Sequence, residues 1–160
     1  MTVGTVKTQK TDLFFAYSGS EILKVACATG INGLSGAADQ IDITCLDSDE
    51  REYVRGLLNP GQVTVPINLI PRSAAHQALI GLRESGDTVS WMVVLSDQTA
   101  EPTTLDSDLA LESPGPTSIE FKGYLADMAI EVTINEIVRA TLTIQRSGPI
   151  TWDLPTADLP

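Results

Sequence analysis

The amino-acid sequence predicts a mainly β protein, an antiparallel β-sandwich or barrel with one flanking α-helix. Several segments alternate apolar and polar residues with a period of two, which is typical of strands that bury one face. Only one segment has apolar residues at helical spacing. No regular alternation of strands with helices indicates a parallel sheet. These three observations together favour an antiparallel architecture.

Length and composition indicate one domain with one hydrophobic core. The chain has 160 residues, of which 42% are hydrophobic and 19% charged, and this composition excludes a disordered protein. We expect a single β-domain over residues 1–150, in which residues 1–20 form an N-terminal arm and the first strand. Residues 47–61 are expected to form a long loop, and residues 151–160 an extended C-terminal tail.

The first clear strand signals lie on either side of a glycine-rich segment. Strands are predicted over Glu21–Thr29 and Asp39–Leu46, and in the second of these Asp42 and Thr44 alternate with apolar neighbours. Gly30–Gly36 contains residues suited to turns. The pattern therefore predicts a hairpin of these two strands with a long glycine-rich tip.

The middle of the chain predicts a strand followed by the one helix. Gln62–Leu69 has strand character, and its Pro66 indicates an edge position or a bulge. Helical spacing follows over Ser73–Gly86, with Ser73 as the N-cap and Gly86 just past the end. We expect this helix to pack across a sheet.

The remaining predicted strands lie on either side of an acidic, proline-containing connection. Thr88–Leu95 should place Trp91 and the other odd-numbered residues on one face. After the connection, Ser118–Ala126 and Ile137–Gln145 both alternate apolar and polar residues and are predicted to be amphipathic strands.

No constellation of residues indicates catalysis, a cofactor or a metal. The single histidine, His76, lies in the predicted helix and has no Cys or His at metal-ligand spacing, so a packing role is expected. A nucleophile elbow of the Gly-x-Ser-x-Gly type is absent. Cys27 and Cys45 are too few for a disulfide framework and are expected to be free thiols.

Charge and hydropathy exclude two classes of partner. The formal net charge is -11, so DNA phosphates should be repelled rather than bound. No apolar run approaches the roughly 20 residues that a membrane helix needs, and the N-terminus lacks the apolar segment of a signal peptide. We therefore expect no membrane partner.

Five stretches of the sequence stand out by their order and spacing, and none of them is an active-site signature. They are Ala28–Ser48, Arg51–Tyr53, Asn59–Val63, Phe121–Leu125 and Arg139–Thr151. In this order and spacing they resemble the phage lambda-like major tail tube protein family of long-tailed, siphophage-type viruses.

The resemblance implies a structural protein of the virion and not an enzyme. It implies a β-sandwich with a flanking helix, joined in rings of six that stack into a tube around a DNA channel. The partners implied are further copies of the chain, the tail tip and tape measure proteins, and the tail terminator protein. DNA would pass transiently without sticking. The chain would be made in the cytoplasm of the host bacterium and would reside in the phage tail.

Two sets of candidate residues follow from this interpretation. Polar strand faces give the channel-lining candidates, which are Asp42, Thr44, Thr141, Thr143 and Gln145. Exposed residues of the predicted loop over 47–61 give the candidates for contacts between rings, which are Arg51, Tyr53, Val54, Arg55, Leu57 and Leu58. The N-terminal segment Met1–Lys10 is a further candidate for these contacts.

Three alternatives remain open at this point. The chain could be a tail terminator or head–tail connector, or a tube protein of the type VI secretion kind, since these share the predicted fold. From a different class, it could be a small hydrolase, which would require a nucleophile and an orienting group around His76.

Overall fold

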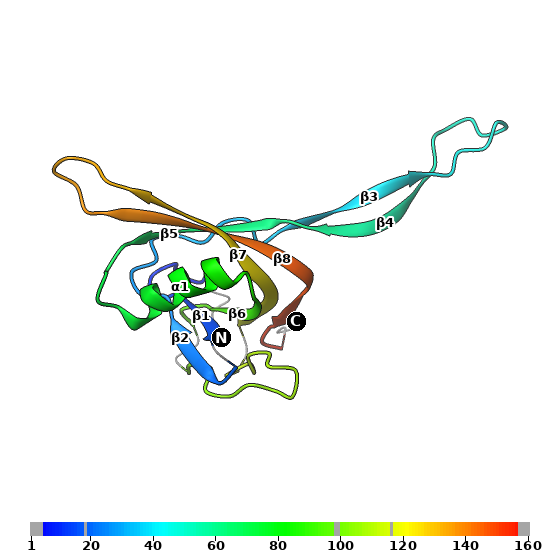
Figure 1. Ribbon diagram of the computed structural model, residues 1–160. Helices are drawn as coiled ribbons and strands as arrows, with labels where there is room; N and C mark the ends of the chain where they lie inside the picture. The colour runs from blue at the N-terminus through cyan, green and yellow to red at the C-terminus, as the bar shows by residue number, and fades with distance from the viewer. Residues whose placement is uncertain (1–4, 18, 98–99, 116, 157–160) are drawn as a thin grey trace.

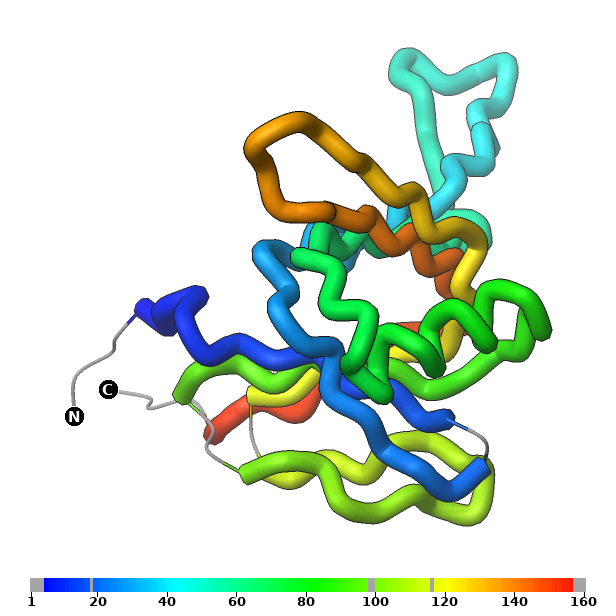
Figure 2. Tube along the Cα trace, turned by 60° about the vertical axis from the view of Figure 1, so that its left-hand side comes forward, coloured from blue at the N-terminus to red at the C-terminus, as the bar shows by residue number. Residues whose placement is uncertain are grey.

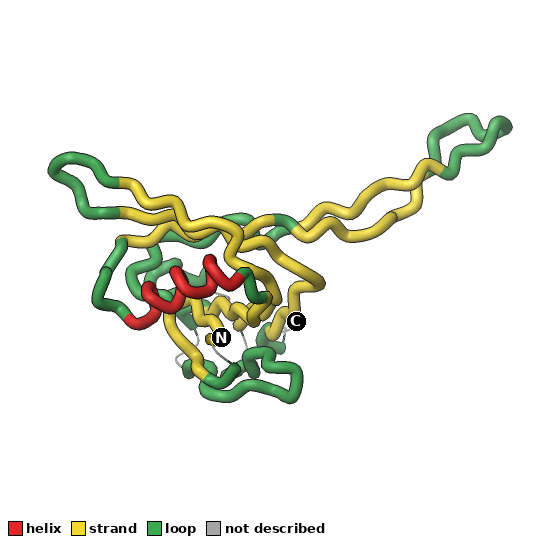
Figure 3. Tube along the Cα trace, viewed as in Figure 1, coloured by secondary structure: helices red, strands yellow, loops and turns green. Residues whose placement is uncertain are grey.

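The computed structural model describes residues 5–17, 19–97, 100–115 and 117–156, and its strands and single helix are drawn in Figures 1 and 3. No helix in these ranges is long and apolar enough to cross a membrane. The elements in chain order are β1 (Asp12–Tyr17), β2 (Glu21–Lys24), β3 (Gly36–Asp42), β4 (Tyr53–Pro60), β5 (Gln62–Asn68), α1 (Ala74–Ser85), β6 (Thr88–Val94), β7 (Ser118–Glu131) and β8 (Arg139–Asp153).

A six-stranded antiparallel sheet forms the body, with the order β2-β1-β6-β7-β8-β5. The first half of β7 pairs with β6 and with the end of β8, whereas its second half pairs with the start of β8, which in turn pairs with β5. Irregularities in the β7–β8 register between Phe121 and Gly123 and between Leu125 and Asp127 allow the strands to bend. One sheet thereby folds over into the two layers of a sandwich.

The main core lies between these layers and is closed by α1, which packs against β7. Trp91 and Phe15 are fully buried, with ring centroids 5.3 Å apart. The predicted faces of β6 are confirmed, because Trp91 and Val93 point into the main core. Met92 belongs to a second, smaller cluster on the other side of the sheet. The mainly β, antiparallel fold class with one helix is thus confirmed.

The helix begins and ends close to where the sequence predicts. Gly86 adopts a left-handed conformation with φ of 71°, and its N–H donates to the carbonyl of Leu82. Ser73 precedes the helix in an extended conformation, although its side chain makes no capping hydrogen bond. Leu79 and Leu82 carry the apolar face of α1 into the core.

The predicted hairpin of Glu21–Thr29 with Asp39–Leu46 is wrong. β2 ends at Lys24 and pairs with β1, while β3 pairs with β4. The glycine-rich segment is no hairpin tip, because it runs beside the edge of β5. There the backbone N–H of Asn32 donates to the carbonyl of Thr64 at 2.9 Å, and the carbonyl of Asn32 accepts from the N–H of Thr64 at 2.8 Å. Pairing with this edge separates the two predicted strands.

Two segments expected to be irregular belong to strands. Within the predicted loop 47–61, Tyr53–Pro60 forms β4, so that only part of the segment is a loop. The expected C-terminal tail begins inside β8, which continues to Asp153 because its last residues pair with the start of β7, Asp153 opposite Ser118. The turn residues Gly148 and Pro149 do not end the strand.

Two hairpins project from the body in different directions (Figures 1 and 2). The first, which we call the arm, comprises residues 36–60 with β3, β4 and the arm tip at residues 43–52. The second is the end of the β7–β8 hairpin, with its tip at residues 132–138. The body alone holds the hydrophobic core, so both projections are supported at one end only.

The bend at Gly123 generates the first testable prediction. A Cβ at this position would lie 2.5 Å from the carbonyl oxygen of Gln145 on the paired strand, so Gly123→Ala requires the backbone to move. We expect the free energy of unfolding to fall by about 1–3 kcal/mol in urea titration of the monomer. Gly30→Ala is the control, because its Cβ would meet no atom closer than the Pro66 side chain at 3.7 Å, an ordinary van der Waals contact. Equal stability of the two variants would contradict this account of the bend.

Candidate assembly surfaces

The arm is a two-stranded ribbon with no support along its length. β3 and β4 pair from Gly36 opposite Pro60 at the root to Asp42 opposite Tyr53 near the tip. Every residue of both strands is exposed or half-buried. Among the described residues neither strand pairs with a third. Because an isolated ribbon of two strands is marginally stable in water, the arm needs a partner.

Large apolar side chains on the arm are open to solvent. Leu57 is 84% exposed and Leu46, at the arm tip, is 110% exposed. Such a collection on one projecting element marks an interaction site. The exposed apolar residues of the arm are Ile41, Ile43, Leu46, Tyr53, Val54, Leu57 and Leu58.

The start of the arm tip is held by a local hydrogen-bond network. The carboxylate of Asp42 accepts from the backbone N–H of Thr44 at 2.9 Å and from its hydroxyl at 2.5 Å. The Thr44 hydroxyl oxygen in turn accepts from the N–H of Glu52 at 3.0 Å. These bonds from Thr44 hold the pKa of the Asp42 carboxyl below its usual value of 3.8. Asp42 is therefore a fixed negative charge where the ribbon opens into its tip.

Two neighbouring residues of β8 hold the root of the arm. Arg146 follows the core-facing register of Leu142 and Ile144, so the residue is buried, with 6% of its surface exposed. Its Nη1 donates to the carbonyl of Ser35, just before β3. The amide of Gln145 donates to the carbonyl of Pro60 at 3.3 Å, at the end of β4. Both strands of the arm are thus tied to β8.

The buried position of Arg146 is unfavourable for its charged side chain. Burial lowers the pKa of its guanidinium, and Nε has no hydrogen-bond partner. None of the ion pairs formed among the described residues includes Arg146. A buried charge without a counter-charge destabilises a fold, so its presence here indicates another function. Its contact with Ser35 indicates that the function is to orient the arm.

The second projecting hairpin has the same character as the arm. Ile134 at its tip is 87% exposed, Val132 is 78% exposed and Ile137 is 65% exposed. Asn135 takes a left-handed conformation, with φ of 60°, which allows the chain to turn. Residues 127–136 lie between the two strands that the sequence predicts over Ser118–Ala126 and Ile137–Gln145. The signal that was missed is the alternation around Met128, which extends β7 beyond Ala126.

The channel-lining candidates lie in two separate places. Thr141 and Thr143 are half-buried on the outer face of the β5–β8 layer, where Thr143 stands opposite Thr64. Asp42 and Thr44 lie on the arm, roughly 20 Å from its root at about 3.3 Å per residue. Gln145 belongs to the first place and also binds the arm root. One chain does not bring all five residues to one face.

The candidates for contacts between rings lie together. All six are exposed. Five of them lie in β4, and Arg51 lies just before it. Arg51 reaches the hydroxyl of Tyr53 at 3.5 Å. Of the N-terminal candidate segment, residues 1–4 lie outside the described part of the chain, and residues 5–10 are exposed.

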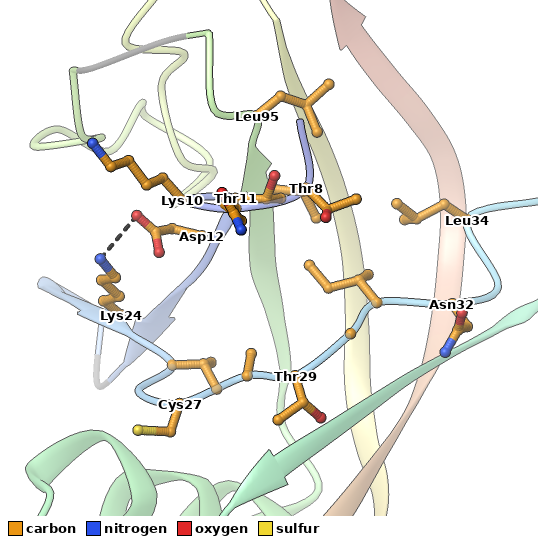
Figure 4. Close-up of a pocket in the computed structure, with 16 residues that line it drawn as sticks. Thr8, Lys10, Thr11, Asp12, Lys24, Cys27, Thr29, Asn32, Leu34 and Leu95 are labelled. Atoms are coloured by element: carbon orange, nitrogen blue, oxygen red, sulfur yellow. Dashed lines mark ion pairs between the residues drawn. The ribbon is translucent and has the colours of Figure 1, made fainter. Parts of the chain in front are cut away.

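A cleft of about 840 Å³ opens on the body (Figure 4). It lies between the segment before β1, the connection from β2 to β3, and the end of β6. Its walls carry Lys10, Lys24 and Cys27, and Lys24 pairs with Asp12 at 2.8 Å. No pattern in the sequence predicted this cleft, because its lining comes from segments distant in the chain.

His76 has the packing role that the sequence predicts. It is 1% exposed; its Nδ1 accepts from the N–H of Ile70 at 2.9 Å, and its Nε2 lies 2.9 Å from the carbonyl oxygen of Ala26. Because Nδ1 accepts a hydrogen bond, Nε2 carries the proton and donates it. Nε2 therefore joins the helix to the connection after β2, and Nδ1 joins it to the segment between β5 and α1. In the described ranges no group of three acidic, His or Cys residues could hold a metal ion.

Comparison with known proteins decides between the interpretations of this architecture. The family described as phage tail tube, TTP, lambda-like, matches residues 4–156. The chain belongs to this family. A relative, "Structural protein 3" of Pseudomonas phage PAJU2, is 36% identical over 148 residues, covering 89% of this chain and 90% of that protein. The tail tube protein described here is accordingly a structural component of the virion and not an enzyme.

Solved structures share the fold at low sequence identity. The tail of an empty GTA particle, solved with C6 symmetry, is 12% identical with a TM-score of 0.69 and covers 92% of this chain and 98% of its own. The SPP1 tail tube is 9% identical with a TM-score of 0.63, covering 94% and 81%. A sheath/tube terminator of an extracellular contractile injection system is 11% identical with a TM-score of 0.67, covering 94% and 98%. The fold alone therefore does not separate tube from terminator, whereas the family does.

The arm root generates the second prediction. Arg146→Met removes the bond to Ser35 while keeping an apolar stem in the buried site, so the arm should loosen more than the core. We expect faster amide hydrogen exchange over residues 36–42 and 53–60, measured by mass spectrometry, with unchanged exchange in α1 and β6. Arg139→Met, at an exposed position of the same strand, is the control. Exchange in the arm as slow as in the unmodified protein would contradict the anchoring role.

Proposed function

We propose that this chain is the repeating subunit of a siphophage tail tube, assembling into hexameric rings that stack around a channel for DNA. The observation that carries the proposal is the pair of unsupported, apolar projections on a well-packed body. Each projection exposes a surface that the monomer cannot cover. A projection that binds a different surface on the next copy makes a head-to-tail contact, which closes into rings or extends as a filament.

The arm supplies the contacts between rings. β3 has seven residues and so spans about 23 Å, which carries the tip well beyond the body. Leu57 and Leu58 would lie against a neighbouring copy with Tyr53 and Val54, while Arg51 and Arg55 supply polar contacts at the rim of the interface. Burial in the tube then supplies the stabilising contacts that the isolated ribbon lacks.

The outer face of the β5–β8 layer is the proposed channel wall. Thr141 and Thr143 present hydroxyl groups without positive charge, and the chain as a whole carries a net charge of -11. The one arginine at the same side of β8, Arg139, is paired with Glu136, so such a wall offers DNA phosphates little to bind and the DNA slides. Asp42 and Thr44 reach the channel only where the arm lies along the wall of an assembled ring.

Head-to-tail assembly leaves different surfaces at the two ends of a tube. One end presents unoccupied arms and the other end presents the surfaces that arms bind. Different proteins are then required to begin and to end the tube, and we assign these roles to the tail tip with the tape measure protein and to the tail terminator. Cys27 and Cys45 are free and exposed, which fits synthesis in the reducing cytoplasm of the host.

Cryo-electron microscopy of the concentrated protein tests the proposal directly. We expect tubes of uniform width built from six-membered rings, with Thr141 and Thr143 at the smallest radius. Isolated rings would favour a terminator role. A tube with these threonines on its outside would overturn the assignment of the channel wall.

A substitution in the arm provides the third prediction. Leu58→Ser should raise the subunit concentration needed for tube formation by about tenfold or more, because burying a leucine side chain contributes about 1.5–3 kcal/mol. Leu109→Ser is a matched control, since both leucines are 54% exposed and Leu109 lies outside the arm. Sedimentation over a concentration series measures the threshold. Equal thresholds for the two variants would contradict the role of the arm.

A further inference from the structure

The cleft on the body carries a small net positive charge in an acidic protein, because Lys10 and Lys24 line it with one carboxylate, Asp12, which pairs with Lys24 at 2.8 Å. The chain has only four lysines, Lys7, Lys10, Lys24 and Lys122. Lys10 and Lys24 line the cleft, and Lys7 lies three residues before Lys10 with its carbonyl bound by Ser96, next to the lining residue Leu95. In a chain whose net charge is -11, this concentration of lysines favours an acidic occupant.

The same cleft also offers apolar surface. Its volume of about 840 Å³ falls within the range of about 300–1,000 Å³ found for ligand sites. Leu34 and Leu95 lie on its walls with Thr8, Thr11 and Asn32 around them (Figure 4). A fitting occupant therefore combines an apolar side chain with negative charges. The apolar lining residues are Val25, Ala28, Ile31, Leu34, Val93 and Leu95.

The arm tip has this combination of properties. Leu46 stands at its end and is fully exposed. Four carboxylates and one arginine lie in residues 43–52, so the tip is strongly acidic. These charged residues are Asp47, Asp49, Glu50, Glu52 and Arg51.

We propose that the arm tip of one copy inserts Leu46 into the cleft of a second copy, with its carboxylates beside Lys10 and Lys24. This inference rests on the proposed tube function and names the receptor of the arm. A chain cannot fill its own cleft, because its arm extends away from the body (Figure 1). The contact joins two different surfaces, so it propagates from copy to copy.

The two cysteines are placed so that this contact can be detected by crosslinking. Cys45 is next to Leu46 at the arm tip, and Cys27 lines the cleft. Both thiols are free and exposed in the monomer. Seating Leu46 in the cleft brings Cys45 of one copy to Cys27 of the next. Cysteine-specific crosslinking therefore detects the contact between copies, and no cysteine has to be introduced.

The experiment treats assembled tubes with a short bismaleimide and separates the products on a denaturing gel. The unmodified protein carries both thiols in every chain and should give a ladder of dimers, trimers and higher species. Cys27→Ser alone and Cys45→Ser alone should each give monomers only. Tubes assembled from an equal mixture of these two variants should give dimers and nothing larger, because each chain then has a single thiol.

Substitution of Leu46 tests whether its side chain enters the cleft. Leu46→Ser should reduce the crosslinked fraction about tenfold at a fixed subunit concentration, because it removes the apolar side chain that enters the cleft. Leu109→Ser, another exposed leucine but remote from the arm tip, should leave the fraction unchanged. Lys10→Glu should lower it as Leu46→Ser does.

The outcomes separate this inference from the proposed function. Tubes that form normally but show no crosslinking between Cys27 and Cys45 overturn the docking, and the tube function stands. Crosslinking of either single-cysteine variant with itself shows a symmetric contact and also overturns the docking. A protein that forms neither tubes nor crosslinked species contradicts both proposals.

Discussion

The rest of the structure depends on the bent hydrogen-bond ladder between β7 and β8. Both strands take part in both layers. The core between the layers therefore exists only because the ladder bends at its two irregular positions. Beyond the body the same ladder continues into the second projecting hairpin. Its register also points Arg146 inward, where the guanidinium reaches Ser35 at the arm root. The bend thereby determines both where the core closes and where the arm leaves the body.

The contrast between body and projections is itself the sign of an assembling protein. The body buries its large side chains completely, as at Trp91 and Leu142. The projections expose theirs on a ribbon that water alone does not stabilise. A monomeric protein would avoid unpaired strand edges beside apolar side chains, because they invite association. Here the unpaired edges and the apolar side chains are kept together on the arm, in a member of the phage tail tube family.

Local sequence patterns predicted the parts of the fold that have one buried face. α1, β5 and β6 all show such a pattern, and each was found within two residues of its predicted bounds. β4 has both faces exposed, so no alternation of apolar and polar residues exists to reveal it. The pairing of β2 and β3 was predicted wrongly because proximity in sequence favoured a hairpin. In the structure, the β5 edge pairs with the segment around Asn32 instead. The cleft and the Arg146 anchor depend on contacts distant in sequence, so they could not be predicted.

The position of the candidate residues explains why a shared fold supports different roles in a tail. Tube and terminator chains resemble this structure similarly well at 9–11% identity, so the sandwich body does not distinguish them. The distinguishing features must then lie where assembly takes place, on the arm, the second hairpin and the surfaces that receive them. In the proposed docking, the acidic arm tip of one copy enters the lysine-bearing cleft of the next, so copies of one kind add repeatedly. Losing either half of that complementarity, while keeping the body, would turn a growing tube into a subunit that stops growth.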